Sequence, residues 1–551
     1  MKVVIACLNS KYIHASLAPW CLLSGVRAYC VSDIQAKVME STINADIADF
    51  AQQIIAEKPD VVSFSSYIWN IEKTLELCEI IKEKTACTIV LGGPEVSYRA
   101  KDVLTKYPFV DYVLCGEGEE SYPAFLDALY SHKGLEWVYG LAYRQGEDIV
   151  TNPEKKYTNT PPSPYCEEFF DNLNGRISYI ETSRGCPYRC AFCLSGRCSE
   201  LRFFDIENVK DDIIRLANSG TKTIKFVDRT FNANTNRANE IIDFIISRHG
   251  EVIPEGVCFH FEIAGDKLQK ETLCILKNAP KGLIQLEIGM QSFNEDTLKA
   301  INRKTDTRKL IENIKALVSF GNMHIHIDLI AGLTGEDLES FERSFDIGYS
   351  LGANMLQMGF LKLLYGADMR ENREKYPCEF MQKPPYEVTS TPWLSSGEIK
   401  RLKKCEDALE RMYNSGRFLF TLEYLLGECG FTPFKLFMSF GNEVDGNGMS
   451  LSGYAAHIYC YFKEFCDEER LRETIICDLL SCSSALQIPE FLKRKDPLYK
   501  KIKKIFTENI NEHNKIAILY KTQKIYVVNQ KSKKNLQGRY EGTFYNLNDF
   551  A

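Results

Sequence analysis

The chain has 551 residues, a formal net charge of -7 at pH 7 and a hydrophobic fraction of 45%. This length exceeds what one hydrophobic core supports and favours roughly three to four domains. The acidic balance argues against a general nucleic-acid-binding surface. The sequence has neither an apolar run of about 18 residues, as a membrane span requires, nor a signal peptide at its start. We therefore expect a cytoplasmic protein, and we expect neither a membrane nor a nucleic acid as its partner.

The sequence contains 20 cysteines, a high count for its length. Many stand in apolar runs, where a free thiol behaves as a small buried hydrophobic side chain in a reducing compartment. Three others, Cys186, Cys190 and Cys193, share the short segment Glu181–Cys193. This segment is the strongest candidate for chemistry in the chain.

The CxxxCxxC spacing of these cysteines lets a tight loop direct three thiolates at one point. Such a set suits a soft metal ion or an iron–sulfur cluster. A four-iron cluster held by three cysteines keeps one iron open, which favours chemistry at the cluster over simple electron transfer. A structural zinc site usually needs a fourth ligand, and Cys198 is the local candidate. The spacing alone leaves both alternatives open.

Residues 1–150 alternate short apolar strands with helical patterns. This rhythm predicts a doubly wound parallel sheet, in which ligands bind at the carboxyl ends of the strands. Glycines at these ends allow a large ligand to approach the backbone, although a Gly-rich turn is also a common loop element. The predicted ligand contacts at the strand ends are Asn9, Tyr12, Ser65, Ser66, Gly92, Gly93, Pro94, Glu95, Gly116, Glu117 and Gly118.

Residues 151–174 are predicted to be a linker, because three prolines fall within Asn159–Pro164 and exclude a helix or a central strand there. From 175 to 370, apolar strands and helices alternate again. Counting Ile177–Thr182 first, six strand–helix units follow one another, which predicts a partial (β/α)6 TIM-like barrel.

Polar residues stand at the strand ends of this second domain, where a barrel of this kind places its active site. By this pattern, Asp228, Glu262, Gln291, Ser292 and Asp328 face the site, although a solvated or ion-paired strand end is the alternative for the acids. His324 and His326 alternate with Asp328 along one strand. They are interpreted as core or barrel-lining histidines, with proton transfer as the alternative.

Residues 371–551 are predicted to be mostly helical. Ser395–Asn414 has apolar side chains on one stripe and Ser396 as a candidate N-cap. Two closing strands are predicted over Lys515–Tyr520 and Lys524–Val528. No motif in this region indicates a substrate.

Several motifs together resemble one enzyme family. The cysteine loop, with an aromatic Phe192 before its last cysteine, is followed by Leu286–Ser292 and by Gly332–Glu336, in which Thr334 stands where the family has proline. Upstream, the Gly-Gly-Pro-Glu and Gly-Glu-Gly-Glu turns resemble those of a cobalamin-binding domain. Residues 1 to about 370 therefore resemble radical S-adenosylmethionine (SAM) enzymes that carry such a domain, in a subgroup with an uncharacterised C-terminal extension.

The resemblance implies the cofactors. Cys186, Cys190 and Cys193 would hold a [4Fe–4S] cluster whose open iron binds SAM, and one electron would cleave SAM to a 5′-deoxyadenosyl radical. The SAM contacts implied by position are Phe192, Asp228, Glu262, Gln291, Ser292 and Arg303. The strand-end residues of 1–150 would hold cobalamin. His14 lacks the family's Asp-x-His-x-x-Gly context, so we expect cobalamin without a histidine ligand; loss of the cofactor is the alternative.

The implied reaction is methylation of an unactivated carbon by way of methylcobalamin. A rearrangement or cyclisation that uses the same cofactors without methyl transfer is one alternative. An iron–sulfur redox or sensor protein is another. The expected partners are a small-molecule or peptide substrate and an external one-electron reductant of the flavodoxin or ferredoxin type.

Overall fold

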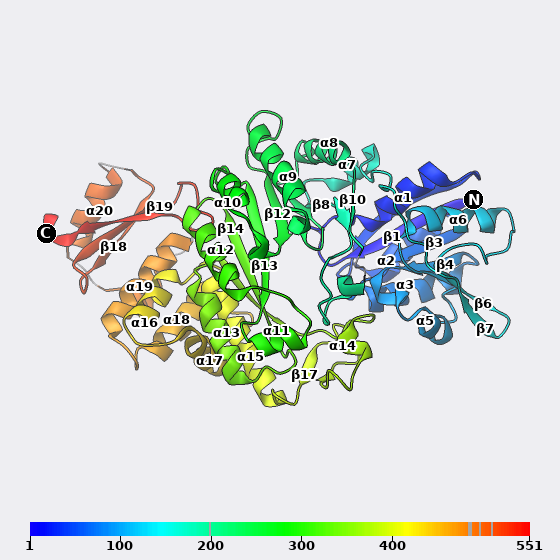
Figure 1. Ribbon diagram of the computed structural model, residues 1–551. Coiled ribbons are helices and arrows are strands. Elements are labelled where there is room, and N and C mark those ends of the chain that lie inside the picture. The colour runs from blue at the N-terminus through cyan, green and yellow to red at the C-terminus, as the bar shows by residue number, and fades with distance from the viewer. Residues whose placement is uncertain (198–199, 483–487, 495–496, 509–510, 551) are drawn as a thin grey trace. The chain divides into compact units, whose positions relative to one another are not determined.

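The computed structural model describes residues 1–197, 200–482, 488–494, 497–508 and 511–550 (Figure 1). The chain divides into two compact units. The first comprises Met1–Leu286, Ile301–Lys304 and Leu361–Val388, and the second comprises Glu287–Ala300, Thr305–Phe360 and Thr389–Ala551.

The first unit begins with a seven-stranded sheet in the order β2-β1-β3-β4-β5-β6-β7. Strands β1 to β5 pair in parallel, and β6 and β7 add an antiparallel edge. This confirms the predicted α/β fold class, although β2 was not predicted, because its residues are only partly buried. The strands are β1 (Lys2–Asn9), β2 (Gln35–Thr42), β3 (Val61–Ser65), β4 (Thr88–Gly92), β5 (Tyr112–Leu114), β6 (Leu141–Gln145) and β7 (Asp148–Thr151).

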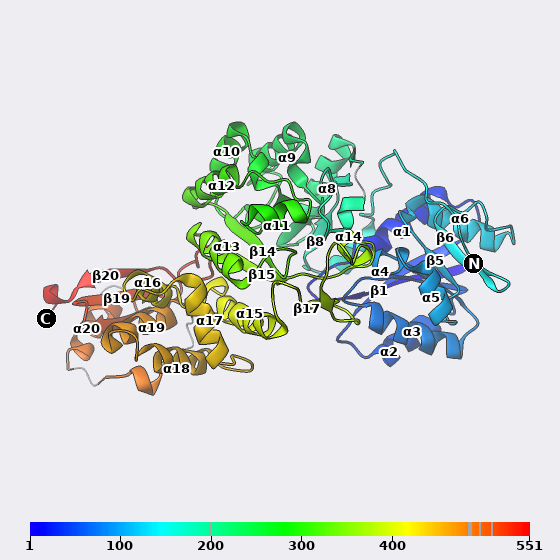
Figure 2. The same ribbon diagram turned by 60° about the horizontal axis from the view of Figure 1, so that its bottom comes forward.

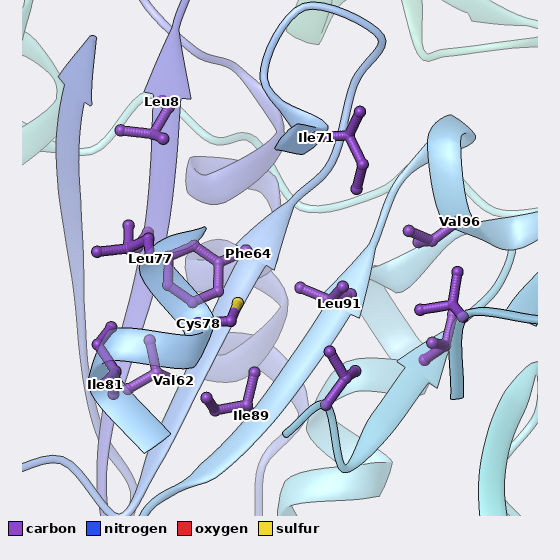
Figure 3. Packing of buried hydrophobic residues seen from close by; sticks show 14 of the residues in the cluster. Leu8, Val62, Phe64, Ile71, Leu77, Cys78, Ile81, Ile89, Leu91 and Val96 are labelled. Atoms are coloured by element: carbon purple, nitrogen blue, oxygen red, sulfur yellow. The ribbon is translucent and has the colours of Figure 1, made fainter. Parts of the chain in front are cut away.

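Helices follow these strands and bury their apolar stripes against the sheet. Figure 3 shows Leu77, Cys78 and Ile81 of one helix beside Val62 and Phe64 of β3, and all five belong to one buried cluster. Burial of such side chains stabilises the fold by about 1.5–3 kcal/mol each. The helices are α1 (Ala18–Tyr29), α2 (Ile47–Ala56), α3 (Ile71–Lys84), α4 (Pro94–Ser97), α5 (Ala100–Lys106) and α6 (Gly118–Tyr130).

The second sheet has six strands in the order β15-β14-β13-β12-β11-β8, so its neighbours follow the chain order. This is the strand sequence predicted for a partial (β/α)6 barrel. The strands are β8 (Ser178–Ile180), β11 (Thr223–Phe226), β12 (Cys258–Ile263), β13 (Ile284–Gln291), β14 (His324–Ala331) and β15 (Met355–Phe360). A two-stranded pair, β9 (Ser183–Arg184) and β10 (Arg202–Phe203), follows β8.

Three helices of this series begin at an aspartate, a residue type that favours the N-cap position. Asp205, Asp306 and Asp337 each accept hydrogen bonds from backbone N–H groups of the first helical turn. A cap of this type contributes about 1 kcal/mol. The helices are α7 (Glu167–Leu173), α8 (Ile206–Ala217), α9 (Thr235–Arg248), α10 (Lys270–Lys277), α11 (Glu295–Ala300), α12 (Thr307–Phe320) and α13 (Leu338–Ser350).

After β15, the segment Leu361–Val388 belongs to the first unit, and it contains α14 (Asp368–Glu371), β16 (Glu379–Phe380) and β17 (Val388–Ser390), which ends just beyond it. The rest of the chain is helical up to a final three-stranded sheet, which α19 contacts (Figure 2). Two of its strands were predicted, and β20 was not. The elements are α15 (Ser396–Leu409), α16 (Leu419–Gly427), α17 (Pro433–Glu443), α18 (Leu451–Phe462), α19 (Glu468–Cys482), α20 (Tyr499–Glu508), β18 (Asn514–Leu519), β19 (Lys524–Asn529) and β20 (Gly542–Asn546).

Within the described part of the chain, no helix has both the length and the apolar composition needed to cross a bilayer.

A buried ion pair ties the last loop to the helices of the second unit. Asp478 on α19 is fully buried, and Arg539 Nη2 donates to its Oδ1 at 2.9 Å. Burial raises the pKa of Asp478, while Arg539 and the hydroxyl of Thr421 act against this rise. The carboxylate is therefore held in the apolar interior by its partners.

We expect Arg539→Met to destabilise the second unit by about 3–5 kcal/mol, because the change leaves a buried charge without its cation. Urea unfolding followed by circular dichroism measures the loss. The double variant Asp478→Asn/Arg539→Met is the control and should recover most of the stability, since it removes both charges. A loss below about 1 kcal/mol in the single variant would show that the pair is unimportant.

Candidate active site

A cavity of about 590 Å³ lies in the first unit at the carboxyl ends of β1, β3, β4 and β5. This volume is in the range of small-molecule and cofactor sites. Its opposite wall comes from the start of the β/α series, where Tyr179, Glu181, Arg184, Val227 and Arg229 line it. The cavity therefore joins the parallel sheet to the segment that leads into the cysteine loop.

Seven of the predicted strand-end residues line this cavity: Asn9, Ser65, Gly92, Gly93, Gly116, Glu117 and Gly118. At Gly93 the backbone has φ +101°, and a Cβ would lie 2.6 Å from the carbonyl oxygen of Ser66. Glycine is therefore required where the ends of β3 and β4 come together.

The other four predicted residues do not line the cavity: Tyr12, Ser66, Pro94 and Glu95. Tyr12 is 63% exposed, and Ser66 is fully buried. Glu95 is buried and receives hydrogen bonds from Arg99, at 2.6 Å, and from the hydroxyl of Tyr386. Its carboxylate is thus engaged with the segment 361–388.

Other residues of the cavity wall were not predicted from the sequence. Tyr67 and Trp69 stack with ring centroids 4.4 Å apart, and both line the cavity. His14 also lines it, with Nδ1 2.6 Å from the hydroxyl of Tyr179. Burial lowers the pKa of His14, helped by Lys225, so its imidazole is neutral at pH 7. The aromatic pair directly after a strand end was the available signal.

The cysteine loop follows β9 and is anchored by main-chain contacts to a distant turn. Ala191 N donates to Ile301 O at 2.9 Å, and Asn302 Nδ2 donates to Arg189 O at 2.8 Å. Asn302 adopts φ 56°, a left-handed conformation that asparagine tolerates better than most residues. Met369 N adds a bond to Ala191 O at 3.0 Å.

The cysteines of this loop are free thiols. Cys186 and Cys190 are buried, with Cys186 Sγ 3.5 Å from the hydroxyl of Thr230. Arg303 Nη1 lies 3.8 Å from Cys190 Sγ. Burial raises the pKa of Cys190, and the Arg303 guanidinium acts against this rise by stabilising the thiolate.

The three cysteine sulfur atoms do not form a compact single-ion site in the structure. Among the described residues, the group of three candidate ligands whose donor atoms all lie within 4.8 Å is Glu287, His326 and Asp328, and it does not include the cysteine triplet. One tetrahedral zinc ion with bonds of about 2.3 Å would bring its sulfur ligands to about 3.8 Å from one another. The cysteine triplet thus lacks the spacing of a preformed single-zinc site. Cys198, the candidate fourth zinc ligand, lies outside the described residues.

The predicted SAM contacts of the first unit differ in how deeply they are buried. Asp228 is 1% exposed and accepts hydrogen bonds from the backbone N of Thr182, at 3.1 Å, and from the hydroxyls of Thr182 and Ser183. Burial raises its pKa to about 6. The Asp228 carboxylate therefore braces the strand that enters the cysteine loop. Phe192 is half-buried within that loop, and Glu262 is exposed at the end of β12.

Gln291 and Ser292 belong to the second unit. Gln291 has φ 70° at the end of β13, and within the described chain its buried Oε1 has no hydrogen-bond partner. A buried acceptor in a strained backbone conformation is typical of a ligand site. Ser292 is instead fully engaged, because its hydroxyl donates to Glu336 Oε1 at 2.6 Å and accepts from Asn294 N at 2.9 Å.

Two carboxylates flank one imidazole on β13 and β14. His326 Nε2 lies 3.0 Å from Asp328 Oδ1, and Nδ1 lies 3.6 Å from Glu287 Oε2. His326 is 7% exposed. The pattern of alternating residues on one strand thus placed His326 beside Asp328 as expected, but Glu287 on the neighbouring strand was not anticipated.

Three family models match consecutive parts of the chain. The B12 binding domain matches residues 3–126, and the radical SAM superfamily matches residues 180–347. The chain therefore has one segment that matches the B12 binding domain and a later segment that matches the radical SAM superfamily. A third model, described as a protein of unknown function (DUF4080), matches residues 374–540.

Two curated relatives match the first part of the chain. The cobalamin-dependent radical SAM methyltransferase TokK of Streptomyces tokunonensis is 29% identical over 313 residues, which is 54% of this chain and 45% of TokK. The hopanoid C-3 methylase of Methylococcus capsulatus is 27% identical over 315 residues, which is 54% of this chain and 57% of that protein. The chain thus spans about half the length of the curated relatives it matches.

Among solved structures, the cobalamin-dependent S-adenosylmethionine radical enzyme OxsB with aqua-cobalamin and S-adenosylmethionine bound matches with a TM-score of 0.58. It is 15% identical, and the match covers 93% of this chain and 76% of OxsB. At this identity the likeness concerns the fold alone.

The Glu336 carboxyl predicts a pH dependence of stability. Ser292 and Ser344 donate to its Oε1 at 2.6 and 3.2 Å, and burial raises its pKa to about 7 from the usual 4.5. The folded state therefore favours protonated Glu336. The stability gained from this proton is complete below pH 4.5 and is lost as the pH rises through about 7.

We expect Glu336→Gln to remove this dependence, which amounts to at most about 3 kcal/mol, because glutamine stays neutral at all these pH values. Urea unfolding followed by circular dichroism at pH 5, 6 and 7 measures it. The wild type should lose stability relative to the variant between pH 5 and 7. Parallel pH profiles would show that Glu336 is ionised in the fold throughout.

Proposed function

We propose that this protein is a cobalamin-dependent radical SAM methyltransferase that acts on an unactivated carbon. One observation carries the proposal: Glu181 and Arg184, which lead into the cysteine loop, also line the 590 Å³ cavity at the strand ends of the B12 binding domain. A cluster site and a corrinoid site that share a wall suit a reaction in which both cofactors act on one substrate.

In this proposal, Cys186, Cys190 and Cys193 hold a [4Fe–4S] cluster. The cavity binds cobalamin through its seven predicted residues together with Tyr67, Trp69 and Tyr122. When bound, the cluster supplies the electron that cleaves SAM to a 5′-deoxyadenosyl radical, and cobalamin carries the methyl group.

The chain's own residues position and shield these groups. Arg303, 3.8 Å from Cys190 Sγ, stabilises the thiolate and offers a cation to the carboxylate of SAM. Gln291, predicted from its position in the sequence, stays a proposed SAM contact. Burial of Cys186 and Cys190 excludes water from the cluster side of the site.

Phe192 and Glu262 stay proposed SAM contacts, through the adenine and through the ribose or amino group respectively. Asp228 and Ser292 support the site indirectly, since their polar atoms hold the strand before the cysteine loop and the turn after β13. An external one-electron reductant of the flavodoxin or ferredoxin type completes the system. The cytoplasmic location stays a prediction.

Methyl transfer is favoured over rearrangement because two curated relatives that match the first part of the chain carry out or are named for methylation. The two reactions leave different products from SAM. Methyl transfer through cobalamin yields both S-adenosylhomocysteine and 5′-deoxyadenosine. A rearrangement or cyclisation yields 5′-deoxyadenosine alone.

We expect Cys190→Ala to abolish 5′-deoxyadenosine formation, because the cluster loses one of its three ligands. The assay uses anaerobically reconstituted protein with SAM, hydroxocobalamin and dithionite, with both SAM products quantified by mass spectrometry. Cys274→Ala, which removes an exposed cysteine of α10, is the matched control and should retain activity within about twofold. Absence of 5′-deoxyadenosine in the wild type would contradict the proposed reaction and support the alternative of an iron–sulfur redox or sensor protein.

We expect Gly92→Leu to lower cobalamin retention at least tenfold, because the new side chain starts at the cavity wall. Its Cβ would meet only Leu114 O at 3.4 Å, an ordinary contact, so the strand itself should fold. Retention is measured by the corrinoid absorbance after gel filtration, and iron content should stay at the wild-type value. Gly427→Leu, at a position with no atom within 4 Å of the new Cβ, is the control. Equal cobalamin retention in the two variants would show that the corrinoid binds outside this cavity.

A further inference from the structure

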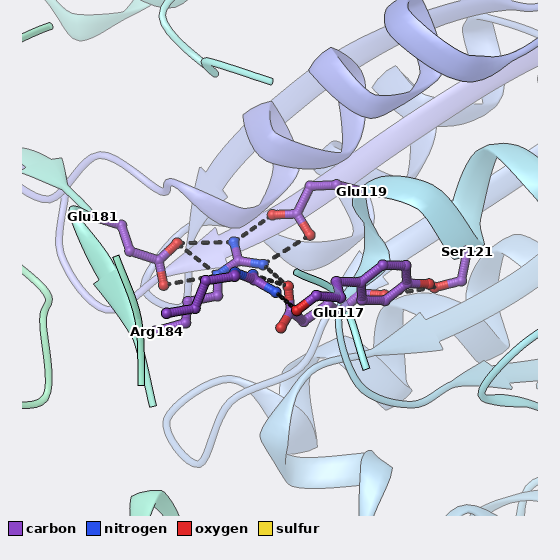
Figure 4. Close-up of polar contacts among 7 residues, drawn as sticks. Glu117, Glu119, Ser121, Glu181 and Arg184 are labelled. Atoms are coloured by element: carbon purple, nitrogen blue, oxygen red, sulfur yellow. Dashed lines mark hydrogen bonds and ion pairs between the residues drawn. The ribbon is translucent and has the colours of Figure 1, made fainter. Parts of the chain in front are cut away.

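Arg184 stands at the meeting point of the two proposed cofactor sites. It belongs to β9, two residues before Cys186, and its side chain is 18% exposed. Figure 4 shows its guanidinium surrounded by the carboxylates of Glu117, Glu119 and Glu181. Glu117 is the N-cap of α6, the helix after β5, and Glu119 lies in the first turn of this helix, whereas Glu181 directly follows β8. The guanidinium thus bridges the B12 binding domain and the strand before the cluster cysteines.

All three nitrogen atoms of the Arg184 guanidinium donate hydrogen bonds to carboxylates. Nη1 and Nη2 donate to the two oxygens of Glu119 at 3.1 and 2.5 Å, and Nε donates to both oxygens of Glu181 at 3.0 Å. Nη1 also donates to Glu117 Oε2. Only a planar group with five N–H donors can satisfy three carboxylates at once, and a lysine ammonium cannot reproduce this fork.

The charge balance makes Arg184 indispensable to the arrangement. Three carboxylates face two guanidinium groups, because Arg202 Nη2 donates to Glu117 Oε2 at 2.6 Å. Burial acts to raise the pKa of Glu119, but Arg184 holds that pKa below its usual value. Without Arg184, the buried Glu119 and the half-buried Glu181 would lose their charged partner, and the start of α6 and the strand would repel each other.

The two residues before Arg184 are also held in place, by hydrogen bonds to Asp228. Thr182 N and Oγ1 donate to the Asp228 carboxylate at 3.1 and 2.7 Å, and the Ser183 hydroxyl donates to it too. Segment 182–184 is therefore fixed to β11 through Asp228 and to the B12 binding domain through Arg184. A ligand in the cavity touches Glu117, Glu181 and Arg184 themselves, since all three line it.

We propose that Arg184 is a positioning residue that couples the two cofactor sites: a ligand in the cavity orders the acidic start of α6, and through Arg184 it orders the strand that presents the cluster cysteines. The proposal rests on the proposed function in taking cobalamin as the cavity ligand and SAM as the cluster ligand. Coupling of this kind is reciprocal, so cobalamin should tighten SAM binding by the same factor by which SAM tightens cobalamin binding.

Equilibrium dialysis of SAM against anaerobically reconstituted protein, with and without hydroxocobalamin, measures the coupling. In the wild type we expect cobalamin to tighten SAM binding by about fivefold or more. In Arg184→Lys the ratio of the SAM affinity measured with cobalamin to the SAM affinity measured without it should fall to within twofold of one.

Arg27→Lys is the matched control. Arg27 also joins two parts of the first unit, through Glu168 at 2.6 Å, but this pair is exposed and does not line the cavity. It should keep the wild-type ratio. Glu119→Gln keeps Arg184 and removes one of its partners, so it should lower the ratio even if Arg184→Lys fails to fold.

Two results would overturn the proposal: a wild-type ratio in both the Arg184 and Glu119 variants, or a ratio of one in the wild type with both cofactors bound. Failure of the wild type to bind cobalamin or SAM would overturn the proposed function as well, so the two failures are distinguishable.

Discussion

The ion-pair network around Arg184 is the contact on which the first unit depends. It satisfies carboxylates from two parts of the chain that are about 65 residues apart, and it does so in a mostly buried setting. Buried charges of this kind add little net stability, but they are costly to break. Their value here is geometric, because they fix the strand that enters the cysteine loop against the wall of the cavity. The opposing hydrogen bonds to Asp228 complete this brace.

The second unit shows the same use of a buried acid at a strand end. Glu336 gathers the hydroxyls of Ser292 and Ser344, so the turn after β13 is held to the turn after β14. Next to it, Gln291 takes up a left-handed backbone conformation with a buried acceptor atom. Polar residues at the strand ends thus divide into two groups. Some brace the turns, and others stay available to a ligand.

Much of the fold could be predicted from the sequence because its strands are continuous apolar runs between turn residues. The strand β2 escaped prediction because it is only partly buried at the edge of its sheet. At the candidate site, local signals located the cysteines and seven cavity residues. They misplaced Glu95, because the partner that engages it, Tyr386, lies 291 residues away. Likewise, no local pattern joins Glu119 to Arg184, since only the packing of two sheets brings them together.

We propose that a corrinoid and an iron–sulfur cluster occupy neighbouring sites in one unit. Arg184 lines the cavity proposed for the corrinoid and stands two residues before Cys186, so the two paramagnetic centres should interact. Pulsed electron paramagnetic resonance on protein loaded with cob(II)alamin measures this directly. The account predicts that reduction of the cluster speeds the relaxation of the cob(II)alamin signal. Two superimposed spectra, each unchanged by the other centre, would contradict it.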